Sequence, residues 1–414
     1  MPARRRARHP DRPRAAQGGG GGAAARALLL RRTVLAGSAG IVLALLPVAV
    51  SAHAQLIGSN PTAGAILDKL PATIDLFFSE PITRAGRGIS VYAPDGRLAS
   101  NGSAMADGSR LSVQLSGGTD GSYEVIWTVI AADTHPSRGA FIFSVGHTSA
   151  VNAPGLGGAD VGLVSPVGLV LQALGRWLHF AGFALGVGAA TYGLFVAKDP
   201  RPMRLAGAGV VLLLVAEPLA LLAQTASLDP SQVVDGDSLT SALASPFGRV
   251  FGLRVAAALV LWAVLGALRQ ASWVRWAIPS LGVALALVDA TAAHTTPALP
   301  QPLGLALNAV HIFAMGIWVG GLAAFAVAPA GGFGRIAAWT AVLLILSGAA
   351  LALLHFGQLR ELMGTPYGIT LLIKVPLVAV ALYLARLGRH RWELAALMLV
   401  LAAAAVVVSL PPPR

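Results

Sequence analysis

The chain has 414 residues, of which 55% are hydrophobic and only 12% are charged. This composition excludes an ordinary soluble protein and indicates several membrane spans. The net charge of +12 does not indicate a nucleic-acid partner, because nine arginines lie within the first 32 residues and others lie between apolar segments, where they serve export and topology. The absence of cysteine excludes disulfides and thiolate copper sites.

Residues 1–52 predict a signal peptide. An Arg-rich start is followed by an uncharged stretch from Val34 to Ala52, whose last residues, Val50-Ser51-Ala52, have the small-residue pattern that signal peptidase accepts. Cleavage after Ala52 would make His53 the first residue, with a free α-amine beside its imidazole. Arg31-Arg32 resembles a twin-arginine signal, so the Sec and Tat export routes both stay open.

Residues 53–148 predict a β-sandwich. Short runs rich in β-branched and aromatic residues are separated by turns such as Pro94-Asp95-Gly96. The runs are 73–78, 89–92, 109–115, 123–129 and 141–145. Short strands at this spacing are typical of a small two-sheet sandwich, for which about 95 residues suffice. A linker rich in Gly, Ala and Pro is expected at 149–162.

Residues 163–410 predict a bundle of about eight transmembrane helices. The segments with the roughly 20 apolar residues of a bilayer span are 165–196, 205–227, 248–268, 274–293, 304–328, 335–355, 367–386 and 392–410. Lys and Arg are concentrated in the connections after the first, third, fifth and seventh spans. The positive-inside rule makes these connections cytoplasmic and places the β-sandwich and the loop at 228–247 outside. We expect a multi-pass protein of the plasma or inner membrane with an extracytoplasmic N-terminal domain.

Three residues of the β region are candidate metal ligands. After signal cleavage His53 would offer two nitrogens, while Asp133 and His135 would add a carboxylate and a second imidazole. Mixed nitrogen and oxygen ligands suit Cu(II), which takes tetragonal geometry and heads the divalent affinity order. The alternative is a surface histidine at a new terminus and a polar turn that binds no metal.

The β region resembles the CopC family of copper-binding domains. The resemblance rests on the start His53-Ala54-Gln55-Leu56 and on residues 59–65, 76–81, 127–129, 133–136 and 139–143. It implies an Ig-like or cupredoxin-like β-sandwich that holds one Cu(II) through His53, Asp133 and His135. A second, Met-rich Cu(I) site, found in some members, is not expected because Met105 is the only methionine of this region.

The membrane region resembles the CopD family. The resemblance rests on Asn308-Ala309-Val310-His311, on residues 316–322, on residues 365–368 with Lys374, and on residues 245–248 with Arg254. It covers most of residues 165–390. The order CopC then CopD in one chain is that of YcnJ-type fusion proteins, which implies copper uptake.

Four histidines fall within or beside the predicted spans. His179 lies near the middle of the first span and His311 in the outer part of the fifth, while His294 and His355 lie at the outer ends of the fourth and sixth. A histidine in hydrocarbon is costly unless it has a partner, so we interpret these four as a membrane copper path, in which Met315 would add a soft ligand for Cu(I). The alternative is that they only join helices by hydrogen bonds.

Four charged residues also fall inside the predicted spans: Glu217, Arg254, Asp289 and Lys374. Unpaired charges are expensive in a membrane. We therefore expect interior ion pairs or proton-linked sites.

These features predict a copper-binding membrane protein, not an enzyme, that captures Cu(II) outside the membrane and imports copper. Its partners would be copper, the lipid bilayer and periplasmic or extracellular copper donors. The sequence has no P-loop, which argues against ATP as an energy source within this chain. Two alternatives stay open. One is a copper resistance or sensing protein that binds without transport. The other is a copper redox enzyme. The argument against this alternative is that Asp133 would occupy an equatorial position at the copper that an enzyme would leave open.

Overall fold

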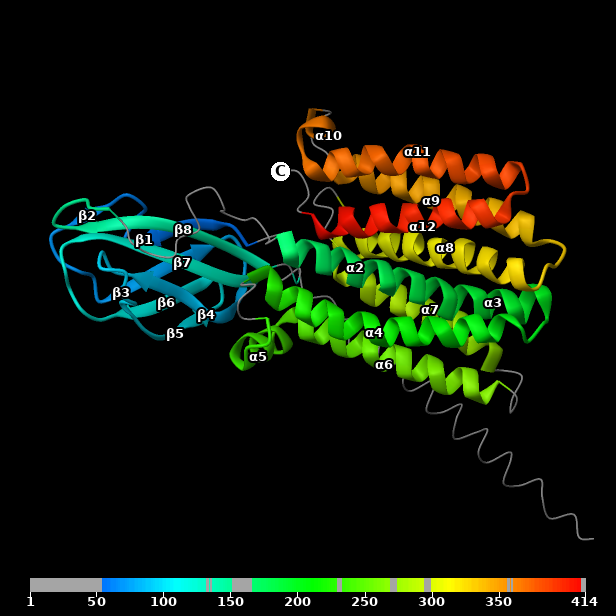
Figure 1. Ribbon diagram of the computed structural model, residues 1–414, viewed down its shortest axis with the longest axis horizontal. Coiled ribbons are helices and arrows are strands. Elements are labelled where there is room, and N and C mark those ends of the chain that lie inside the picture. Colours follow the sequence, from blue (N-terminus) through cyan, green and yellow to red (C-terminus); the bar gives the residue numbers. More distant parts are fainter. Residues whose placement is uncertain are drawn as a thin grey trace, which may run out of the picture.

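The computed structural model describes residues 54–131, 134, 136–150, 166–228, 233–268, 274–293, 299–355, 358 and 360–410. The predicted signal peptide and most of the predicted linker, residues 151–162, lie outside these ranges. The chain forms an N-terminal β-sandwich and a bundle of long helices, which lie end to end (Figure 1). The predicted fold class, a β-sandwich followed by membrane helices, is confirmed.

Two four-stranded sheets form the sandwich. One sheet has the order β1 (Leu56–Asn60), β3 (Thr73–Phe78), β6 (Arg110–Leu115) and β5 (Ser100–Asp107). The other has the order β2 (Ile66–Leu67), β8 (Pro136–Val145), β7 (Gly121–Ala131) and β4 (Ile82–Tyr92). The pairings are antiparallel except that of β2 with β8.

The core of the sandwich follows from alternation along the strands. Ile74, Leu76 and Phe78 are every second residue of β3 and are almost fully buried. Because successive side chains of a strand point to opposite faces, these three meet the other sheet. There, Trp127 of β7 packs edge-on against Phe78 with ring centroids 5.1 Å apart.

Within the described ranges, eight helices are long and apolar enough to cross a membrane, as the hydropathy pattern predicted. The first runs from Pro166 to Ala197 through α2 (Pro166–Phe183), η1 (Ala184–Ala189), α3 (Ala190–Tyr192) and η2 (Gly193–Ala197). The others are α4 (Pro202–Leu228), α6 (Pro246–Ala267), α7 (Val274–Thr291), α8 (Gln301–Val327), α9 (Phe333–His355), α11 (Pro366–Arg386) and α12 (His390–Ser409). The side chains of Ser245 and Thr365 cap α6 and α11 just before a proline, whose fixed φ and missing N–H suit a first turn.

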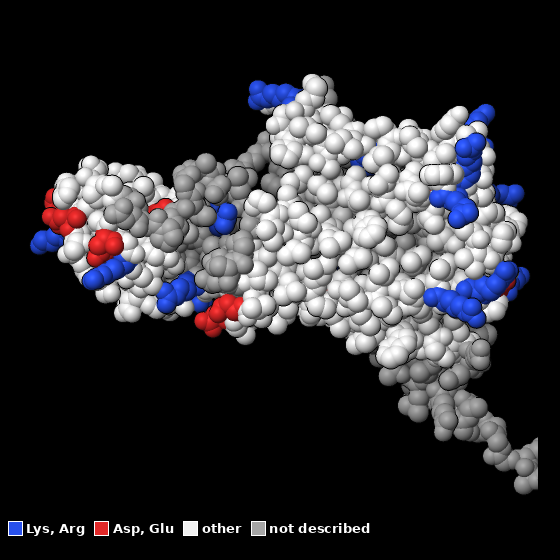
Figure 2. Space-filling model, in the orientation of Figure 1, with Lys and Arg blue, Asp and Glu red and all other residues white. Residues whose placement is uncertain are grey.

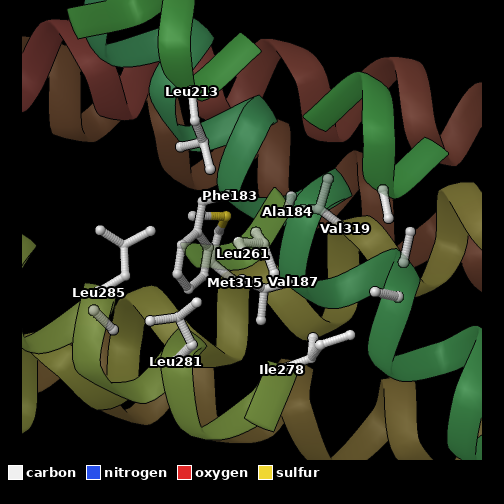
Figure 3. Close-up of a cluster of buried hydrophobic side chains, with 14 of the residues drawn as sticks. Phe183, Ala184, Val187, Leu213, Leu261, Ile278, Leu281, Leu285, Met315 and Val319 are labelled. Atoms are coloured by element: carbon white, nitrogen blue, oxygen red, sulfur yellow. The ribbon is translucent and has the colours of Figure 1, made fainter. Parts of the chain in front are cut away.

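The centre of the bundle is packed through small residues. A Cβ added to Gly188 in η1 would overlap the carbonyl oxygen of Gly316 in α8, and one added to Gly320 would overlap that of Ala184. Small residues let two backbones approach this closely, which is how helices associate in a membrane. The apolar side chains around this contact include Phe183, Val187, Leu213, Leu261, Leu281 and Met315 (Figure 3).

Basic side chains gather at the end of the bundle away from the β-sandwich (Figure 2). The connection from η2 to α4 carries Lys198 and Arg201, and the connection from α11 to α12 carries Arg389. Both connections lie at that end (Figure 1). The charge asymmetry along the sequence is therefore also an asymmetry between the two ends of the folded bundle.

Two short helices, α5 (Gly236–Ala244) and α10 (Arg360–Gly364), lie between spans where the sequence predicted only loops. The side chain of Asp235 accepts a hydrogen bond from the backbone N–H of Ser238 and so caps α5. Ala242 of α5 and Phe247 of α6 form a small apolar cluster with Ala85 and Ile130 of the sandwich. Helix α5 thus helps to join the two parts of the chain.

Candidate functional site

Four of the predicted metal ligands lie outside the described residues: His53, Asp133, His135 and His294. The Cu(II) centre of the β region therefore stays a prediction. Thr134, between two of these residues in the chain, is described: it is 7% exposed and its φ is 73°. It also lines a cavity in the bundle.

This cavity, of about 530 Å³, contains all three membrane histidines that the structure describes. His179 comes from α2, His311 from α8 and His355 from the end of α9. Met315 of α8 also lines the cavity and is 8% exposed. The structure thus brings residues of three predicted spans to one internal space. From the sequence, this proximity could be inferred only from the predicted depth of the histidines in the membrane.

His179 is held between two carboxylates. Its Nδ1 lies 2.9 Å from Oε1 of Glu217 in α4, and its Nε2 lies 3.0 Å from Oδ2 of Asp289 in α7. The Nε of Arg254 in α6 donates to the other oxygen of Asp289 at 2.8 Å. These four side chains form one buried network that joins four helices, and the predicted pairing of Glu217, Arg254 and Asp289 is confirmed.

The chemistry of this network follows from its hydrogen bonds. A neutral imidazole has one N–H and one lone pair, so it donates to only one carboxylate. Two hydrogen bonds from His179 to two carboxylates require a second proton, on the ring or on an acid. Both ring nitrogens are then engaged, and among the described residues no group of three His, Asp or Glu is arranged to hold a metal ion. The Oε2 of Glu217 has no hydrogen-bond partner in the described part of the chain.

His311 and His355 have different surroundings from His179. His311 Nδ1 lies 2.9 Å from the hydroxyl of Ser347, which in turn donates to the carbonyl of Leu343. His355 Nδ1 donates to the carbonyl of Leu351 at 2.7 Å. Each ring thus has one nitrogen hydrogen-bonded to a neutral oxygen, and a neutral imidazole is the form that ligates copper.

Lys374 of α11 also lines the cavity. Within the described ranges no carboxylate lies within ion-pair distance of it, so the predicted pairing is not found for this residue. Its charge faces the cavity together with that of Arg176, whose Nη1 donates to the carbonyl of Val408. The cavity therefore carries cationic groups as well as the carboxylates of the His179 network.

Several polar residues of the cavity wall were not predicted from the sequence. Gln172 and Arg176 line it together with His179, and their spacing of four and three residues places all three on one face of α2. Glu217 and Gln224, seven residues apart, share a face of α4 in the same way. Polar residues at helical spacing inside an apolar span were the signal that could have found this wall.

Comparison with known proteins assigns both parts of the chain. Residues 56–146 match the CopC domain family, and residues 167–298 match the family "Copper resistance protein D-like, N-terminal domain". The second match ends well before the last of the residues on which the CopD resemblance rests.

Two relatives illustrate the similarity. "Copper resistance protein C" of Xanthomonas campestris pv. juglandis is 32% identical over 117 residues, which cover 25% of this chain and 89% of that protein. "Copper transport protein CutJ" of Bacillus subtilis is 25% identical over 303 residues, which cover 69% of this chain. The chain spans only 55% of the length of CutJ.

Solved structures resemble the β-sandwich as well. CopC from Methylosinus trichosporium OB3b shares 24% identity and covers 24% of this chain, with 97% of its own length matched and a TM-score of 0.22.

Proposed function

Because the chain belongs to the CopC family through residues 56–146 and continues into a copper resistance protein D-like domain, we propose that it captures Cu(II) outside the membrane and passes copper inward. The observation that carries this proposal is the cavity of the bundle. It is lined by Thr134 of the β-sandwich and by His179, His311, His355 and Met315 of the membrane helices. A transporter needs such an internal space next to its capturing domain.

The capture site would be formed by His53, Asp133 and His135. Removal of residues 1–52 would free the α-amine of His53, so that two nitrogens, a carboxylate and a second imidazole surround Cu(II). Periplasmic or extracellular copper donors would load this site. An extra residue before His53 should weaken Cu(II) binding to the β domain, because the α-amine would be displaced; titration with Cu(II) measures this.

The membrane orientation that supports uptake has the β-sandwich outside. The basic end of the bundle, away from the sandwich (Figure 2), would then be cytoplasmic in agreement with the positive-inside rule. Copper entering at the sandwich end would meet His355, His311 and His294, with Met315 deeper in α8 as a soft ligand for Cu(I). His179 would contribute through its carboxylate network, since both of its ring nitrogens are hydrogen-bonded.

A second candidate function is copper resistance by binding without transport. It is favoured by the match of the β-sandwich to a protein named for copper resistance. In that case the membrane domain would anchor the sandwich, and changes in the cavity would leave the copper content of cells unchanged.

The test measures copper entry into cells or proteoliposomes for the wild type and for His311→Ala at equal membrane abundance. We expect His311→Ala to lower entry by about tenfold, as loss of one metal-site residue commonly does, and to leave Cu(II) binding by the β domain unchanged. His390→Ala is the matched control, because His390 pairs with Glu393 at 3.3 Å and does not line the cavity. Equal entry in wild type and His311→Ala would contradict a copper path through this cavity.

A further inference from the structure

The β-sandwich and the membrane bundle share a hydrogen bond at the wall of the cavity. Nε2 of Gln224 in α4 donates to the backbone carbonyl oxygen of Thr134 at 2.8 Å. Both residues are buried, with 4% and 7% of their surfaces exposed, and both line the cavity. A buried hydrogen bond between two parts of a chain fixes their relative position, because its loss would leave polar groups without partners.

The backbone at Thr134 is held in an unfavourable conformation. Its φ of 73° is in the left-handed region, which a β-branched residue rarely adopts and which strains the backbone. The N–H of Thr134 donates to the carbonyl of Ala131 at 3.1 Å, so the chain turns sharply at the end of β7. Gln224 donates its hydrogen bond to the carbonyl oxygen of Thr134 in this turn. Such strain persists only where the surroundings hold it in place.

An apolar contact supports the same arrangement. Ala85 of β4 and Ile130 of β7 pack with Ala242 of α5 and Phe247 of α6. Ala85, Ile130 and Ala242 are almost completely buried. The sandwich therefore rests on the bundle through this apolar cluster, beside the hydrogen bond at Thr134.

We propose that Gln224 is a positioning residue that docks the copper loop of the β-sandwich over the cavity, so that copper passes between the two without entering the surrounding solution. The proposal rests on the proposed function. Asp133 and His135 adjoin Thr134 in the chain, and consecutive Cα atoms are about 3.8 Å apart. Fixing Thr134 at the cavity wall thus limits how far these two proposed ligands can lie from the cavity.

Docking matters because a released ion partitions between the cavity and the solution. When donor and acceptor belong to one chain and lie side by side, the acceptor has a high effective concentration at the donor, on the order of millimolar for short connections. When the loop is undocked, the ion diffuses away and any external chelator competes for it. The partition of one bound copper ion therefore reports on docking.

The experiment uses the full chain in proteoliposomes that enclose a copper-binding dye. The protein is loaded with one equivalent of radioactive Cu(II) in the cold, freed of unbound copper, and warmed with excess membrane-impermeant EDTA outside, with and without ascorbate. We expect most of the copper to reach the lumen in the wild type. In Gln224→Met, which keeps the side-chain volume but loses the donor, we expect the luminal fraction to fall about fivefold, the change that loss of one hydrogen bond of ordinary strength produces.

Two controls separate docking from folding. Thr225→Val removes another buried hydrogen-bond donor of α4, whose hydroxyl donates to the carbonyl of Val233 at 2.8 Å and not to the sandwich. Because Thr225 does not line the cavity, this variant should partition copper like the wild type. Cu(II) affinity should be the same in all three proteins. Without EDTA, copper should still enter the Gln224→Met vesicles.

Each outcome decides something. Copper that goes mainly to EDTA in the wild type, or equal partition in wild type and Gln224→Met, would overturn docked transfer while leaving transport intact. An equal fall in Thr225→Val would show a general effect of removing a buried hydrogen bond from α4 and would overturn the role of Gln224. No luminal copper in the wild type without EDTA would contradict the proposed function and this inference with it.

Discussion

Breaking the ion pair between Arg254 and Asp289 should destabilise the protein strongly. Their side chains are 16% and 2% exposed, and the Nε of Arg254 lies 2.8 Å from Oδ1 of Asp289. Asp289→Asn keeps the shape of the side chain but leaves a buried guanidinium without its counterion. Removing one partner of a buried pair costs about 3–5 kcal/mol, and scales of membrane insertion give about 2.5–3.5 kcal/mol for a central charge.

This magnitude can be measured as thermal unfolding of the full chain in detergent, followed by tryptophan fluorescence. A loss of about 3–5 kcal/mol corresponds to a fall in melting temperature of roughly 6–20 °C for a domain of this size. The double variant Arg254→Gln/Asp289→Asn removes both charges. It should cost less than the sum of the two single changes, with an interaction energy of about 2–3 kcal/mol.

A matched control lies in the connection between η2 and α4. Arg201 and Asp199 are also 2.8 Å apart, but this pair is exposed to solvent. Asp199→Asn should leave the melting temperature unchanged, since water already solvates both charges. If Asp289→Asn behaved like Asp199→Asn, or if the two changes in the buried pair were additive, the His179 network would not stabilise the bundle as an ion-paired unit.

Two further predictions concern the sandwich and the helix packing. Burial raises the pKa of Glu124 above its ordinary value of 4.5. The folded domain therefore keeps the proton on the Glu124 carboxyl group to a higher pH than the unfolded chain does. Its stability falls as pH rises from the unfolded pKa through the raised folded pKa. Glu124→Gln should therefore gain stability over the wild-type β domain at neutral pH, and denaturant unfolding should show the gain vanish below about pH 4.5; a gain independent of pH would contradict this. Gly188→Ala would press a methyl group against the backbone of α8 and should cost about 1–3 kcal/mol of stability in detergent, whereas Gly207→Ala, with open space around its Cβ, should cost nothing. Equal melting temperatures of these two variants would show that the contact between η1 and α8 tolerates a side chain.

In the sheet with the order β1-β3-β6-β5, local patterns predicted the two central strands but not the two edge strands. Residues 73–78 are rich in β-branched and aromatic residues, residues 109–115 alternate between apolar and polar, and the structure has β3 and β6 there. The strands β1 and β5 lie at the two edges of the same sheet and were not predicted. Most of β5 is exposed, and its sequence, Ser-Asn-Gly-Ser-Ala-Met-Ala-Asp, has no regular alternation. Such a segment becomes a strand because a neighbour offers hydrogen bonds, which is decided by tertiary structure.

The same division applies to the candidate site. Hydropathy showed that Glu217, Arg254 and Asp289 are charges within spans and therefore need partners. It could not show that His179 lies between Glu217 and Asp289, which are 38 and 110 residues away from it in the chain. These contacts depend on which helix faces pack together. Because the helices are apolar nearly all round, their hydropathy does not identify those faces.

The sequence by itself determined the two-part architecture, the number and limits of the spans, and the concentration of basic residues on one side of the membrane. It could do so because a bilayer imposes rules of length, hydropathy and charge that act on each segment separately. The resemblance to copper-binding and copper-transport families also came from residues that are close together in the chain. Only the tertiary structure decided that three membrane histidines share one cavity and that Gln224 binds the turn at Thr134. Those facts arise from contacts between distant segments, and their geometry follows from packing that no local pattern specifies.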